Sequence, residues 1–161
     1  MRMPDDHSRH HARAPQPSVN RTALSATIHC LTGCAIGEIL GMVIGTATGL
    51  ANWTTIVLSV VLAFFFGYSL TMLPLLRAGL ALRRAAGLAF ASDTASIALM
   101  ELVDNAIMVY IPGAMDAGPG TLLFWASLLV SLLAAGIMAF PLNRWLIGRG
   151  KGHAVLHAHH R

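Results

Sequence analysis

Four long apolar blocks restrict this chain to very few folds. They cover residues 23–50, 54–76, 86–111 and 121–146. A helix needs about 20 apolar residues to cross a bilayer, and every block is at least that long. Because 55% of the residues are hydrophobic and only 11% are charged, too little polar surface remains to cover a soluble core. The sequence therefore predicts an all-α integral membrane protein, a four-helix bundle whose surroundings are the lipid bilayer.

The polar ends of the chain flank a single membrane domain. We expect residues 1–20 to be a disordered polar tail, residues 21–150 the four-helix transmembrane domain, and residues 151–161 a basic, His-rich tail. The net charge of +4 is spread over tails and connections, so no nucleic-acid surface is expected. The His residues of the two tails could bind a divalent metal or could have no dedicated role, and the sequence leaves both open.

All eleven Lys and Arg residues fall on one side of the membrane if all four blocks span it. These residues are Arg2, Arg9, Arg13, Arg21, Arg77, Arg83, Arg84, Arg144, Arg149, Lys151 and Arg161. Under the positive-inside rule that side is the cytoplasm. The pattern predicts that both termini are cytoplasmic and that the protein lies in a bacterial inner membrane. The segment PLLR at 74–77 is echoed by PLNR at 141–144, which indicates two hairpins in tandem.

Glycine recurs at every fourth position of the first block. The members of this glycine row are Gly33, Gly37, Gly41, Gly45 and Gly49. Residues four apart lie on one side of a helix, so the row forms a continuous flat groove. Such grooves let transmembrane helices approach closely, either within one chain or between two copies. The row predicts helix packing, and a homo-oligomer through the first helix is one use of it.

A second row in the first block carries reactive side chains. Cys30, Cys34, Glu38 and Met42 repeat at the same interval beside the glycines, and His29 lies at the head of the groove. Thiol, imidazole and thioether groups together select soft or borderline transition metals. The row therefore predicts a copper or zinc site. Buried structural cysteines and thiol redox chemistry at Cys30 and Cys34 remain alternatives.

The third block carries a matching row of acids and thioethers. Asp93, Met100 and Asp104 share one face at helical spacing, Glu101 flanks that face, and no Lys or Arg accompanies them. Carboxyl groups at this depth must be protonated, hydrogen-bonded, in contact with water or paired with a cation. The first and third helices run in the same direction, so the two rows can face each other. We expect an inner cluster of His29, Cys30, Cys34 and Asp93, and a middle cluster of Glu38, Met42, Met100, Glu101 and Asp104.

Several runs of this sequence resemble a known family. The runs are HCLTGCAIGE at 29–38, DTASI at 93–97 continuing to MELVDN at 100–105, and NRWL at 143–146 with GKGH at 150–153. They are similar to a bacterial integral-membrane family known only as a domain of unknown function, with family number 4396. The resemblance covers nearly everything after the N-terminal tail. It implies a compact four-helix membrane domain and no established activity.

Two functions of different classes fit these patterns. In the first, the bundle binds and translocates a cation, most plausibly a copper-like metal, between the first and third helices. In the second, it is a non-transporting module that packs against a partner through the glycine row. No nucleophile elbow, phosphate loop or zinc-protease spacing is present, so we do not expect an enzyme.

Overall fold

The computed structural model describes residues 18–149, and within them the chain folds into four long α-helices. Their bounds are α1 Val19–Thr48, α2 Asn52–Arg77, α3 Leu82–Tyr110 and α4 Leu122–Gly148. Each is long and apolar enough to cross a membrane, which confirms the four predicted spans. Most of the two predicted tails lies outside the described residues.

The helix ends follow from local sequence signals. The Ser18 hydroxyl accepts a hydrogen bond from the Arg21 backbone N–H at 3.4 Å and so caps the start of α1. Thr121 caps α4 in the same way through the Phe124 N–H, at 3.3 Å. Gly49 ends α1 with a φ of +67°, in the left-handed region that favours glycine. The last glycine of the row is therefore a helix terminator.

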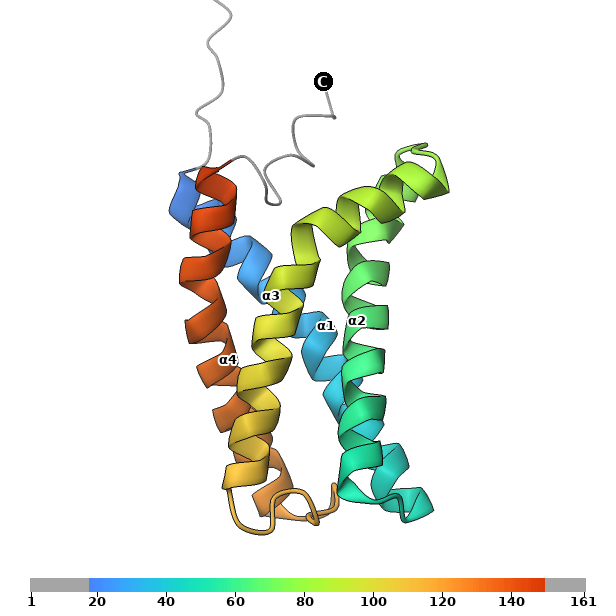
Figure 1. Ribbon diagram of the computed structural model, residues 1–161, viewed down its shortest axis with the longest axis vertical. Helices are drawn as coiled ribbons and strands as arrows, with labels where there is room; N and C mark the ends of the chain where they lie inside the picture. Colours follow the sequence, from blue (N-terminus) through green and yellow to red (C-terminus); the bar gives the residue numbers. More distant parts are fainter. Residues whose placement is uncertain (1–17, 150–161) are drawn as a thin grey trace, which may run out of the picture.

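The helices form two consecutive hairpins packed into one bundle (Figure 1). α1 packs along α2 and α3 along α4, and the hairpins join through contacts of α1 with α4 and of α2 with α3. α1 also contacts α3 across the bundle. In the view of Figure 1, α1 crosses obliquely behind α3. Both ends of the described chain lie at the same end of the bundle, as the topology prediction requires. The contact between α1 and α3 brings the two chemical rows together.

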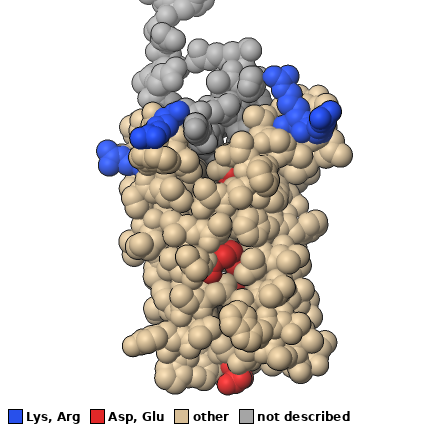
Figure 2. Space-filling model, viewed as in Figure 1, with Lys and Arg blue, Asp and Glu red and all other residues tan. Residues whose placement is uncertain are grey.

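The sides and ends of the bundle differ in chemistry. Large apolar side chains such as Phe65, Leu102 and Ile137 are 60%, 70% and 71% exposed on its sides. The arginines gather at one end, which we call the arginine end (Figure 2). Its described members are Arg21, Arg77, Arg83, Arg84, Arg144 and Arg149. We call the opposite end, with residues 49–51 and 111–121, the turn end. Apolar sides and polar ends fit a protein surrounded by lipid.

The glycine row of α1 is filled by α2 of the same chain. A Cβ atom added to Gly33 would lie 2.6 Å from the Gly67 Cα, and one added to Gly41 would lie 2.6 Å from the Ser59 Cα. Gly37 faces the Ala63 backbone equally closely. The two helices therefore pack almost backbone to backbone along this row.

This packing corrects one expectation about the row and shows what fills the rest of it. Gly49 does not belong to it, because nothing lies within 4 Å of a Cβ added there. The groove is also not open to a second copy or to a partner, because α2 occupies it along Gly33, Gly37 and Gly41. Within this chain the row therefore packs α1 on α2, and a homo-oligomer through the first helix stays a prediction.

Candidate functional site

Three carboxyl groups from two helices meet inside the bundle. Glu38 comes from α1, and Glu101 and Asp104 come from adjacent turns of α3. Their side chains are 2%, 4% and 2% exposed, and the Glu38 carboxyl lies close enough to interact electrostatically with both of the others. We call this group the carboxyl cluster. Figure 2 shows acidic atoms at about half the height of the bundle, far from the arginine end.

Several oxygen atoms of the carboxyl cluster have no hydrogen-bond partner among residues 18–149. They are the Glu38 Oε2 and both Asp104 carboxyl oxygens. The Ser131 hydroxyl of α4 lies next to Asp104, but it donates its proton to the Leu128 carbonyl at 3.0 Å. Buried polar atoms normally have partners, so each of these oxygens can accept a proton or contact a cation.

Glu101 is better supported than the other two acids. The Asn105 Nδ2 donates to the Glu101 carboxyl oxygen Oε2 at 3.4 Å and to the Glu101 backbone carbonyl at 2.9 Å. The Cys34 thiol of α1 lies close to the same carboxyl group. The sequence placed Cys34 level with Asp93. The structure places it beside Glu101, so Cys34 belongs with the carboxyl cluster.

A second polar group lies nearer the arginine end. Asp93 is fully buried, and its carboxyl oxygen Oδ1 accepts a hydrogen bond from the Ser92 hydroxyl at 2.7 Å. The Cys30 thiol lies close to the carboxyl group of Asp93 and to the hydroxyl of Ser96. The predicted pairing of Cys30 with Asp93 is therefore present. Both cysteines are buried and neither forms a disulfide.

His29 is directed toward α2 in the contact that the structure describes. Its Nε2 forms a hydrogen bond of 3.0 Å with the Thr71 hydroxyl, and the side chain is half-buried. The sequence grouped His29 with the thiols of its own helix. The bond to Thr71 instead makes it part of the contact between α1 and α2.

The methionines of the two rows lie in different places. Met100 packs in a cluster with both cysteines and Ile97. Met42 packs with Met108 and Phe124 in an apolar cluster toward the turn end. Met42 therefore helps to seal the carboxyl cluster on that side with apolar groups, and only Met100 shares a packed cluster with the thiols.

No group of three or more His, Cys, Asp and Glu side chains within residues 18–149 is disposed to hold a metal ion. The two rows do face each other, as the sequence predicted. Their donor groups divide between the carboxyl cluster with Cys34, the Cys30 and Asp93 pair, and the His29 contact with Thr71. The histidines of both tails lie outside the described residues.

One buried polar contact was not predicted. The Asn143 Nδ2 of α4 donates to the Thr27 hydroxyl of α1 at 2.9 Å, and both side chains are 4% exposed. Asn143 lies among apolar residues near the end of α4. A single amide side chain in such a stretch needs a buried hydrogen-bond partner, and this signal could have predicted the contact. This bond joins the first and last helices near the arginine end.

The comparisons with known proteins agree with the resemblance drawn from the sequence. The family model described as "Domain of unknown function (DUF4396)" matches residues 19–152, which include all four helices and the carboxyl cluster. Neither the curated proteins nor the solved structures contain a match. The chain is a small four-span membrane protein, and it belongs to the DUF4396 family.

Proposed function

We propose that this protein binds a cation reversibly at the carboxyl cluster. The observation that carries the proposal is the set of buried carboxyl oxygens on Glu38 and Asp104 without partners among residues 18–149. All six arginines of the described chain are exposed, so none can neutralise the cluster. Three ionised carboxylates at this depth would repel each other and would lose their hydration by water. The cluster must therefore carry protons or another cation.

The proton is the cation that requires the least rearrangement. A protonated carboxyl group becomes a hydrogen-bond donor, and a proton on Glu38 or Asp104 would remove the repulsion between the two groups. Acids buried in a membrane bundle commonly mark proton and ion pathways. We therefore propose proton binding as the primary activity, and proton-coupled movement of a second solute as its extension.

A soft metal ion is the second candidate, and the position of Cys34 favours it. A thiol beside the Glu101 carboxyl, with Met100 in the neighbouring packed cluster, supplies donors that copper prefers. The donor groups lie apart in the described geometry, so metal binding requires side chains to move toward one another. Copper or zinc would then be the expected cofactor or cargo.

Charge-removing variants with matched volume test the proton proposal. We expect Glu38→Gln and Asp104→Asn to lose a protonated-carboxyl band in infrared difference spectra and to reduce proton uptake after a pH jump in liposomes. Asp5→Asn is the matched control, because Asp5 precedes α1 in the sequence and belongs to neither proposed site. If band and uptake stay at the wild-type level in both cluster variants, the carboxyl cluster is a packing feature and the proton proposal is wrong.

Elemental analysis separates the metal candidate from the proton one. We expect Cys34→Ser to reduce bound copper or zinc steeply with little effect on folding, because it exchanges a soft ligand for a hard hydroxyl of similar size. Cys30→Ser is the control at a thiol away from the carboxyl cluster. Equal metal content in wild type and Cys34→Ser, with proton uptake intact, would eliminate the metal candidate alone.

We further propose that the arginine end faces the cytoplasm of a bacterial cell. The support is the gathering of Arg side chains at that end and the absence of Lys and Arg from residues 49–53 and 111–121 (Figure 2). The carboxyl cluster then lies nearer the membrane centre than either surface.

A further inference from the structure

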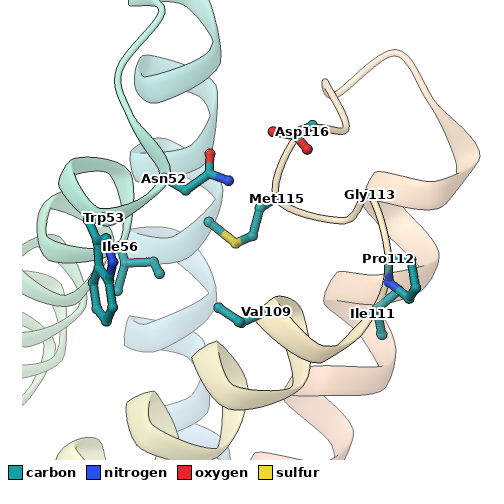
Figure 3. A pocket seen from close by; sticks show the side chains of 9 residues that line it. All are labelled: Asn52, Trp53, Ile56, Val109, Ile111, Pro112, Gly113, Met115 and Asp116. Atoms are coloured by element: carbon teal, nitrogen blue, oxygen red, sulfur yellow. The ribbon is translucent and has the colours of Figure 1, made fainter.

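A pocket of about 300 Å³ lies at the turn end, away from the carboxyl cluster. It is formed by the start of α2, the end of α3 and the loop that follows α3 (Figure 3). Six apolar side chains make most of its wall: Trp53, Ile56, Val109, Ile111, Pro112 and Met115. Its volume is at the lower limit of small-molecule sites, about 300 to 1,000 Å³. A compact, partly apolar ligand fits such a space.

The pocket has two polar side chains, and the only charge among them is negative. Asn52 and Asp116 lie on the same side of the pocket, with the Met115 side chain below them in the view (Figure 3). Asp116 is the only charged residue in the lining. The described arginines all lie at the opposite end of the bundle (Figure 2). Among residues 18–149, the pocket therefore offers a carboxylate with no arginine or lysine near it.

Trp53 adds an aromatic face at the edge of the pocket. Its side chain is 78% exposed, so the indole ring is available to a ligand that arrives from the membrane surface. Aromatic rings attract ammonium groups through their negative faces, and carboxylates attract them through charge. Hydrophobic walls complete a site for the apolar part of the same molecule.

We propose that this pocket binds a small organic cation, an ammonium group with a compact apolar body. The ammonium lies at Asp116, and the apolar body lies on Ile56 and Val109, on the side of the pocket that Trp53 closes (Figure 3). The proposal does not depend on the carboxyl cluster, because the two features share no residue. It assigns a binding site to the turn end, where an amphipathic ligand can enter from the membrane interface.

Asp116 has one structural alternative that the test must separate. The N-cap residue of α2, Ala51, makes no side-chain hydrogen bond to the first turn, so a nearby carboxylate could offset the positive end of that helix. In that case Asp116 would affect stability and would not affect ligand binding. The thermal stability of each variant without ligand must therefore be measured beside its affinity.

The test titrates defined ammonium compounds and follows the fluorescence of Trp53. Trp125 and Trp145 are replaced by Phe, so that Trp53 is the sole reporter in lipid nanodiscs with uncharged headgroups. The probes are benzyltrimethylammonium, choline, and the uncharged carbon analogue of choline, 3,3-dimethylbutan-1-ol. We expect affinity to fall in that order, because the first probe has charge and apolar area and the last has no charge.

The Asp116→Asn variant should raise the Kd of benzyltrimethylammonium about threefold to fivefold, the effect of one exposed charge contact. Asp116→Glu should restore most of the affinity, because it keeps the charge. The proposal is overturned if choline binds no more tightly than its uncharged analogue, or if Asp116→Asn lowers thermal stability and leaves the Kd of benzyltrimethylammonium unchanged.

Discussion

Replacing Gly33 with Ala tests the contact between α1 and α2 with a single methyl group. The added Cβ would lie 2.6 Å from the Gly67 Cα and 2.8 Å from its backbone N, whereas ordinary contacts are 3.4 to 4 Å. Both neighbouring atoms are backbone, so no side-chain rotation can relieve the clash. The two helices must separate locally by about 1 Å, and overpacking of this kind costs about 1 to 3 kcal/mol.

Gly87→Ala is the matched control for this substitution. Gly87 lies inside α3, and nothing lies within 4 Å of a Cβ added there. Alanine favours helix over glycine by about 1 kcal/mol in water, so the control should be neutral or stabilising. The measurement is reversible unfolding of the purified protein in mixed micelles, with wild type and both variants under the same conditions.

The predicted order of stability is Gly87→Ala, wild type, Gly33→Ala. Helix propensity alone would make both variants equal to or better than wild type. If Gly33→Ala and Gly87→Ala unfold at the same fraction of denaturing detergent in the mixed micelles, the close packing of α1 on α2 does not stabilise this bundle. The interpretation of the glycine row as an intrachain contact would then be wrong.

Two further predictions concern the contact between α1 and α4 and the topology. Thr27→Val should cost about 1 kcal/mol in the same unfolding assay, because it leaves the Asn143 amide without its acceptor, whereas Thr32→Val, at an exposed site, should be neutral. A stable Thr27→Val variant would show that this bond contributes nothing. A tag at Gly118 should be labelled from outside the cell and tags at Arg9 and His160 should not; external labelling of His160 would refute four spans.

The number of helices could be predicted from hydropathy because a bilayer requires about 20 apolar residues in each span. Helix ends were less predictable. The third block was expected at residues 86–111, but α3 begins at Leu82 and includes Arg83 and Arg84. Hydropathy marks the part of a helix that lies in hydrocarbon, and the first turn of α3 extends beyond it with charged side chains.

The partner of the glycine row could also have been found in the sequence. α2 carries small residues at the same interval of four, and all of them are buried: Thr55, Ser59, Ala63, Gly67 and Thr71. Two small-residue rows with one period, on helices joined by a short turn, favour packing within the hairpin. The glycine row of α1, taken without the row of α2, fits α2 and a second copy equally well.

The candidate site was predictable in its residue types and less so in its grouping. Glu38 can face the acids of α3 because α1 and α3 run in the same direction and these residues lie at the same depth in the membrane. The contacts of Cys34 with Glu101 and of His29 with Thr71 depend on the rotation of each helix about its axis. Packing against neighbouring helices sets that rotation, and a shift of one residue turns a side chain by about 100°.

The sequence by itself determined that this chain crosses a membrane four times, with its arginines at one end and uncompensated acids inside. These properties follow from transfer free energies that each segment carries alone. Only the tertiary structure decided that α2 fills the glycine row and that Glu38, Glu101 and Asp104 form one cluster. Those outcomes are properties of pairs of helices, because shape complementarity between surfaces selects one arrangement from several that the spacing permits.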